Sequence, residues 1–212
     1  APGVVCLEDT HNAAGGTVLT PDQIDAVAAA AHEAGFAVHL DGARVFNAAV
    51  ALGVDVRELT RSVDSVSVCL SKGLCAPVGS MLVGTRAFIE EAVSMRKRMG
   101  GGMRQAGILA AAGLVALDTM VGRLAEDHSH ARLLSERLAE IPGIEIDPSG
   151  VETNIVIFRT RKVAAASLAD RLRAAGVLCL AISADKIRMV THHDVSRDQV
   201  LRAAAEIVRS AA

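Results

Sequence analysis

Residues 66–79 read Val66-Ser-Val-Cys-Leu-Ser-Lys72-Gly-Leu-Cys-Ala-Pro-Val-Gly79, which is a hydrophobic strand that stops at a polar, glycine-bounded turn. Lys72 stands at the mouth of this strand, where we expect partial desolvation to disfavour its ammonium form and leave a nucleophilic amine. Asp41 closes another predicted strand 31 residues upstream. The pattern therefore predicts one amine and one carboxylate at the ends of neighbouring strands.

An amine and a carboxylate placed in this way suit the two ends of a pyridoxal phosphate ring. The amine can form a Schiff base, and the carboxylate can keep the pyridine nitrogen protonated so that the ring acts as an electron sink. Each residue also has a purely structural interpretation. Lys72 can be a solvated head on an apolar stem, and Asp41 can cap the turn Asp41-Gly42-Ala43.

Strands and helices alternate through the first part of the chain. Thr20, Pro21 and Gln23 form a strong helix start, with an N-cap, a proline at the first helical position and a capping box. The alternation predicts an α/β fold, with a mostly parallel sheet that carries helices on both faces. The last strand is expected to run antiparallel because only a short turn precedes it. We predict strands at 4–7, 36–40, 63–70 and 78–83, and helices at 21–34, 44–52, 86–99 and 104–121.

A change in composition near residue 122 marks the expected domain boundary. Residues 1–122 form the predicted large, cofactor-binding domain, and residues 123–212 form a small C-terminal α+β domain. In the second domain a long amphipathic helix ends before Pro142-Gly143. We predict strands after it at 144–146, 154–158, 177–182 and 187–191, and helices at 164–175 and 197–210.

The composition argues against several classes of protein. The 212 residues carry a net charge of −2 and contain four phenylalanines but no tryptophan or tyrosine, so nothing suggests a nucleic-acid surface. The four cysteines form no CxxC pair, and His192-His193 lack partner ligands, which argues against a metal site. The chain lacks the pattern of a signal peptide, and its longest apolar run, 106–117, is too short to span a bilayer. We therefore expect a cytoplasmic protein.

Six segments occur in an order that is typical of one enzyme family. Together they resemble the low-specificity L-threonine aldolases, which are pyridoxal phosphate enzymes of the aspartate-aminotransferase-like fold (fold type I). The resemblance runs from near residue 4 to the C-terminus. The segments are Leu7-Glu-Asp-Thr-His11-Asn, Gly15-Gly16, His39-Leu-Asp41-Gly-Ala-Arg44, Ser71-Lys72-Gly-Leu-Cys-Ala-Pro-Val-Gly79, Arg96-Lys97 followed by Gly100-Gly-Gly-Met-Arg104-Gln, and Ile187-Arg188-Met-Val-Thr-His192.

This resemblance implies roles for the residues around the cofactor. Lys72 would hold the pyridoxal phosphate and then act as a proton carrier, while Asp41 would pair with the pyridinium. Lys97 and Arg104, which bracket Gly100-Gly101-Gly102, would approach the cofactor phosphate from a neighbouring subunit. The alternative for these two residues is a basic helix end in solvent.

The resemblance also implies which residues handle the substrate. Arg44, which belongs to the cofactor-binding set as well, and Arg188 would grip the substrate carboxylate through paired hydrogen bonds. That grip would orient the Cα–Cβ bond for cleavage. His11 would lie against the β-hydroxyl and hold or take its proton. The alternatives are surface ion pairs for the arginines and a hydrogen bond to a loop carbonyl for His11.

The implied reaction is the cleavage of L-threonine, its allo isomer and related β-hydroxy-α-amino acids into glycine and an aldehyde, by a homotetramer. Members of this family carry a phosphate-cradling segment ahead of the Leu7–Asn12 motif. No Ser-Gly-Thr turn leading into a helix precedes Asp41, so we expect the chain to be the C-terminal portion of such an enzyme. Two alternatives stay open: another pyridoxal phosphate reaction, such as β-elimination or racemisation, and a non-catalytic fragment.

Overall fold

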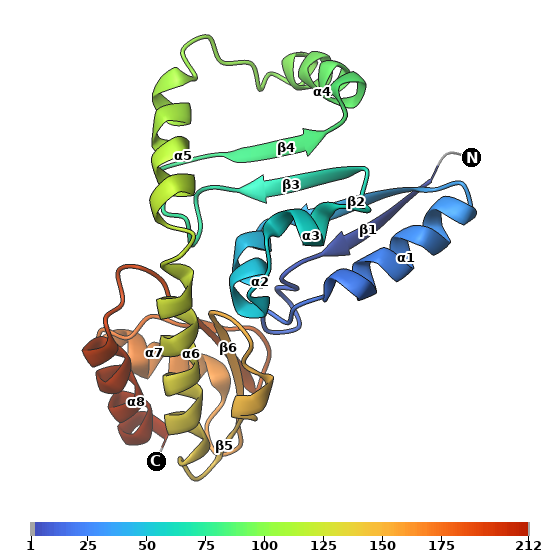
Figure 1. Ribbon diagram of the computed structural model, residues 1–212. Helices are drawn as coiled ribbons and strands as arrows, with labels where there is room; N and C mark the ends of the chain where they lie inside the picture. The colour runs from blue at the N-terminus through green and yellow to red at the C-terminus, as the bar shows by residue number, and fades with distance from the viewer. Residues whose placement is uncertain (1–2, 212) are drawn as a thin grey trace. The chain divides into compact units, whose positions relative to one another are not determined.

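The computed structural model describes residues 3–211, which fold into two compact units (Figure 1). The first unit comprises the chain up to Thr10 together with Leu19–Leu124. The second comprises His11–Val18 and the chain from Ala125 onward. His11–Val18 therefore belongs to the second unit, although its position in the sequence places it among residues 1–122.

The first unit contains a four-stranded sheet in the order β1-β2-β3-β4. Strands β1, β2 and β3 are mutually parallel, and β4 runs antiparallel to β3. This arrangement confirms the predicted α/β fold with a mostly parallel sheet, including the antiparallel last strand. The strands are β1 (Val4–Glu8), β2 (Ala37–Gly42), β3 (Ser65–Cys69) and β4 (Ser80–Gly84).

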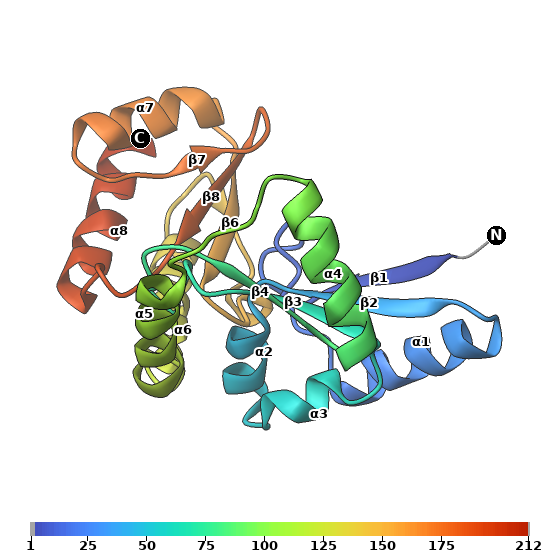
Figure 2. The ribbon, with the colours of Figure 1, turned by 90° about the horizontal axis from the view of Figure 1, so that it is seen from above.

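Helices α1, α2 and α3 lie on one side of this sheet (Figures 1 and 2). Helix α1 begins with the predicted capping box: the hydroxyl of Thr20 accepts from the Gln23 amide, and the Gln23 side chain accepts from the Thr20 amide at 2.8 Å. Helix α3 has five residues with Asp55 as its N-cap, and the sequence patterns do not predict it. The helices of this unit are α1 (Pro21–Glu33), α2 (Val45–Leu52), α3 (Val56–Thr60), α4 (Arg86–Arg98) and α5 (Gly107–Thr119).

Strand register divides the side chains of this sheet between two faces. Val38 is fully buried and packs against Ala28 and Ala31 of α1. Since successive side chains of a strand point to opposite faces, His39 and Asp41 of β2 lie on the other face. The side chain of Asp41 is exposed there, close to the carboxyl end of the strand.

The second unit pairs an antiparallel sheet, in the order β5-β6-β8-β7, with three helices. Val156, Phe158 and Ile187 of the sheet belong to one apolar core with residues of α6, α7 and α8. The elements are α6 (Leu124–Ala139), β5 (Ile144–Glu145), a short 3-10 helix (Pro148–Gly150), β6 (Ile155–Thr160), α7 (Ala165–Ala174), β7 (Leu180–Ala181), β8 (Lys186–Val190) and α8 (Arg197–Ala211).

The segment 11–18 is fixed to the second unit by hydrogen bonds. The hydroxyl of Thr153 donates to the carbonyl of Gly16 at 2.7 Å, and the amide of Val18 donates to the carboxylate of Glu152 at 2.8 Å. Gly16 has a φ of +81°, and a Cβ at this position would collide with the Thr153 hydroxyl. Glycine is therefore required where the segment meets the unit.

No single helix within residues 3–211 is both long enough and apolar enough to cross a membrane. Helices α5 and α6 together have the length and composition, but the chain bends by 67° between them.

Candidate active site

Neighbouring residues hold the carboxylate of Asp41 through one of its two oxygens. The Ala43 amide donates to Oδ1 at 3.0 Å, and the Ser67 hydroxyl donates to the same atom at 3.4 Å. The first of these bonds is the turn cap expected from Asp41-Gly42-Ala43. No hydrogen bond to Oδ2 forms within the part of the chain that the structure describes, so this oxygen can accept a hydrogen bond from a ligand.

Arg44 precedes α2 and is half-buried beside Asp41. Burial lowers the pKa of its guanidinium, and the Glu8 and Asp41 carboxylates oppose this shift, with Glu8 the stronger of the two. An anionic ligand would therefore meet Arg44 in competition with the Glu8 and Asp41 carboxylates.

Lys72 lies in the loop that follows β3. Three backbone hydrogen bonds brace this loop: Leu70 to Gly79 at 3.0 Å, Ala76 to Leu70 at 3.0 Å and Cys75 to Lys72 at 2.9 Å, each from amide to carbonyl. The side chain of Lys72 is exposed, so the partial desolvation expected from the sequence is wrong for the described chain. The strand pattern indicates where the lysine stands but not what covers it.

The apolar residues of the same loop anchor it to the core. Leu70, Leu74 and Ala76 are buried in one cluster with Ala116 and Leu124. Because β2 and β3 are parallel, the loop after β3 and the end of β2 meet the same edge of the sheet. Lys72 and Asp41 are thus both placed at the carboxyl edge, on neighbouring strands.

His11 and Arg188 belong to the second unit. The amide of Ala14 donates to Nδ1 of His11 at 3.0 Å, and Arg188 of β8 donates to the side-chain oxygen of Asn12 at 2.8 Å. The alternative foreseen for His11 was a bond to a loop carbonyl, whereas its ring accepts from a loop amide. With Nδ1 acting as acceptor, the neutral ring carries its proton on Nε2.

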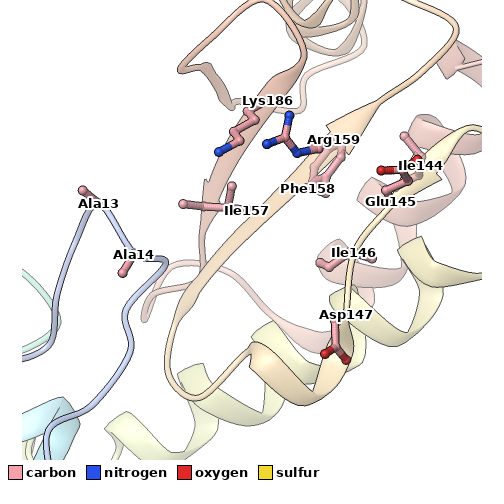
Figure 3. A pocket seen from close by; sticks show the side chains of 10 residues that line it. All are labelled: Ala13, Ala14, Ile144, Glu145, Ile146, Asp147, Ile157, Phe158, Arg159 and Lys186. Carbon is pink, nitrogen blue, oxygen red and sulfur yellow. The ribbon is translucent and has the colours of Figure 1, made fainter.

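A groove of about 760 Å³ opens on the face of the second sheet that carries Arg188 (Figure 3). Its lining includes Arg159 of β6 and Lys186 of β8, which are paired across the two strands, and Ala13 and Ala14 stand opposite them in the view. None of the predicted site residues lines the groove, although Lys186 is only two positions before Arg188 on the same face.

Lys97 and Arg104 line a separate hollow of about 430 Å³ in the first unit. Arg96 lines it too, and the chain turns there through Gly100, whose φ is +80°. The lining contains no carboxylate. Three cations facing one hollow suit an anion such as a phosphate.

Two residues of these sites were not identified from the sequence. Arg96 lies beside Lys97 in the helix and gave no separate signal. Ser67 could have been found by alternation, because Ser65 and Ser67 alternate with Val66 in β3 and must share one face. No group of three or more potential metal ligands exists among residues 3–211.

The structure therefore gathers the predicted residues into three sets. The Asp41 carboxylate acts electrostatically on Arg44, and Lys72 lies at the same sheet edge. His11 and Arg188 share the second unit through the segment 11–18. Lys97 and Arg104 share the cationic hollow.

Comparisons with known proteins identify related chains. A family model described as beta-eliminating lyase matches residues 1–161. The chain is 44% identical over 200 residues to low-specificity L-threonine aldolase 1 of Arabidopsis thaliana, covering 93% of this chain and 56% of the relative. It is 46% identical over 203 residues to the low specificity L-threonine aldolase of Escherichia coli O157:H7, covering 95% of this chain and 58% of the relative. The chain thus spans a little over half the length of these relatives.

The fold itself has solved counterparts. A structure of threonine aldolase from Leishmania major superposes with a TM-score of 0.76 at 18% identity, covering 100% of this chain and 62% of that one. At this level of identity the likeness concerns the arrangement of the helices and strands.

Proposed function

Because this chain belongs to the beta-eliminating lyase family, we propose that it is part of an enzyme that uses pyridoxal phosphate to cleave L-threonine, L-allo-threonine and related β-hydroxy-α-amino acids. The products would be glycine and an aldehyde. The relatives named low-specificity L-threonine aldolase support this choice among the reactions of the family. The observation that carries the proposal is that Asp41 and Lys72 stand at the same edge of a parallel sheet, with Arg44 beside Asp41.

The residues at this edge fit the cofactor. Asp41 is held at Oδ1 by Ala43 and Ser67, so Oδ2 can meet a protonated pyridine nitrogen. Lys72 is exposed and makes no ion pair within the described chain, so its amine is available for covalent attachment. When bound, pyridoxal phosphate supplies an electron sink for the electron pair released at the substrate Cα.

The arginines would then orient the substrate. Arg188 would bind the substrate carboxylate through its fork of N–H groups, and the bond from Arg188 to Asn12 holds the side chain in place. Arg44 would serve the same end of the substrate or the cofactor ring. Holding the carboxylate fixes the rotation about the N–Cα bond of the substrate, so that the Cα–Cβ bond is oriented for cleavage.

His11 would act on the β-hydroxyl as a hydrogen-bond donor. Nδ1 accepts from the Ala14 amide, which places the proton of the neutral ring on Nε2. The ring would therefore position the hydroxyl oxygen, and the hydroxyl proton would leave to a different group. Lys72 would hold or move the proton at Cα through its Nζ.

The cationic hollow lined by Arg96, Lys97 and Arg104 would receive the cofactor phosphate bound in a neighbouring subunit. The absence of a carboxylate from its lining supports this role. We accordingly propose a homotetramer, placed in the cytoplasm, whose reaction supplies glycine.

β-Elimination is the second candidate, because the matching family model carries that description. Lys72 and Asp41 would serve either reaction. The products decide between them, since threonine gives glycine and acetaldehyde by retro-aldol cleavage but ammonia and 2-oxobutanoate by elimination.

The first test is covalent attachment of the cofactor. The purified chain is mixed with pyridoxal phosphate, reduced with borohydride and digested, and the modified lysine is located by mass spectrometry. We expect modification at Lys72, loss of that adduct in Lys72→Ala and no change in Lys162→Ala, an exposed lysine of the second unit. A saturable adduct at another lysine in the unsubstituted chain would contradict the assignment.

The second test is analysis of the products from threonine. Glycine and acetaldehyde in equal amounts would support the aldolase. Ammonia without glycine would show that the reaction is the elimination and not the aldol cleavage.

A further inference from the structure

A cavity of about 300 Å³ lies in the second unit, and none of the residues proposed above to handle cofactor or substrate lines it. Its apolar wall is formed by Leu134 of α6, Met189 of β8, Val200 of α8 and Val177, which follows α7. These four side chains are nine-tenths or more buried. The wall is therefore a continuation of the apolar core.

The polar groups of the cavity are donors. Arg202 makes one long hydrogen bond, to the carbonyl of Ala175 at 3.5 Å, and takes part in no ion pair of the described chain. Gln199 uses its side-chain oxygen to accept from the Ser196 amide at 2.8 Å, so its NH₂ group remains available. His192 accepts from the Asp194 amide through Nδ1 at 3.3 Å, which leaves Nε2–H on the neutral ring.

No carboxylate lines the cavity. Glu206, four positions after Arg202 in α8, is paired with Arg209, and Asp194 is not among the residues that line the cavity. The positive charge of Arg202 contributes to the lowered pKa of Glu206, although the hydrogen bond from Arg209 is the main cause. Arg202 thus keeps N–H groups for a further acceptor.

An apolar wall with a few converging donors is typical of a small-molecule site. The cavity is open to solvent beside its polar groups, because His192, Gln199 and Arg202 are exposed, so a ligand can enter from that side. The cavity volume corresponds to that of about ten water molecules in the liquid. A guanidinium binds a carboxylate through two parallel hydrogen bonds, which selects the polar end of the ligand.

We propose that this cavity binds a small apolar carboxylate, with a branched aliphatic tail against Val177, Met189 and Val200 and the carboxylate on Arg202. Met189 directly follows Arg188 in β8. A bound ligand would therefore contact β8, which presents Arg188 on its opposite face. The inference stands on the cavity alone and does not depend on the aldolase proposal.

The test uses 3-methylbutanoate and its neutral isostere 3-methylbutanamide, titrated into the 212-residue chain by isothermal calorimetry. We expect saturable binding of the carboxylate and at least about tenfold weaker binding of the amide, since a charged hydrogen bond is lost. Arg202→Gln should weaken carboxylate binding by a similar factor. Arg197→Gln, which makes the same charge change on the same helix outside the cavity, should leave it unaltered.

A second variant tests the position of the tail. Ala203 lines the cavity, so Ala203→Leu should fill it and abolish binding while circular dichroism shows the unit still folded. Equal affinity for acid and amide, unchanged binding in Arg202→Gln or retained binding in folded Ala203→Leu would each overturn the proposal. So would the absence of saturable binding of the carboxylate up to about 10 mM, which is weak even for so small a ligand.

Discussion

Gly16→Ala should destabilise the second unit by about 2–4 kcal/mol. The backbone term comes from φ at +81°, a left-handed conformation that costs an L-residue about 1–2 kcal/mol. The steric term comes from the new Cβ, which would collide with the Thr153 hydroxyl and approach Cβ of Ile155 to 3.3 Å. Overpacking of this kind costs a further amount of about 1–3 kcal/mol. The reduced conformational freedom of the unfolded chain offsets about 0.4–1 kcal/mol of this loss.

The neighbouring glycine provides a matched control. Gly15 has a φ of +92°, but a Cβ there would meet only Cδ1 of Ile157, at 3.8 Å. Gly15→Ala should therefore carry the backbone term without the collision, and cost about 1 kcal/mol. Urea unfolding followed by circular dichroism gives both values. Equal destabilisation by the two substitutions would refute the argument that Thr153 closes over Gly16.

Two further predictions concern the first unit. The side-chain hydrogen bond from Arg57 is the main cause that lowers the pKa of Asp55 to about 2 from its usual 3.8; because the folded pKa is depressed, the stabilisation is present above about pH 4 and is lost as the pH falls toward 2. Asp55→Asn should therefore lose less stability than the unsubstituted chain between pH 4 and pH 2, as urea midpoints at the two pH values would reveal, and an identical pH dependence would count against the pair. A Cβ on Gly73 would lie 2.7 Å from Cδ2 of buried Leu124, so Gly73→Ala should reduce the free energy of unfolding by about 1–3 kcal/mol. A Cβ on Gly122 would meet nothing within 4 Å, so Gly122→Ala should leave stability nearly unchanged. Similar melting temperatures for the two variants would disprove the close contact.

Much of the fold follows from local patterns in the sequence. The capping box at Thr20 sets the start of α1, and runs of apolar residues locate the strands on either side of it. Helix α3 escaped prediction because five residues give too short a window for a 3.6-residue period. Alternation along β3 fixes which residues share the Asp41 face, so the Ser67 bond was within reach of sequence reasoning.

Other features depend on contacts between distant parts of the chain. The bond between Thr153 and Gly16 spans 137 positions, and that between Arg188 and Asn12 spans 176. No local pattern encodes such a pairing, so the sequence alone does not show that the segment 11–18 belongs to the second unit. The exposure of Lys72 has the same origin, since solvation is decided by what packs over a strand end.

The membership of His11–Val18 in the second unit sets how often the chain passes between the units. The chain passes between the two units at Thr10–His11, returns at Val18–Leu19 and passes again at Leu124–Ala125. Three covalent tethers join the units, so a proteolytic cut in any one of them leaves two intact. Because the segment 11–18 is bonded to the second unit through Thr153, Glu152 and Arg188, His11 and Arg188 stay in the same unit even where one of these connections is cut.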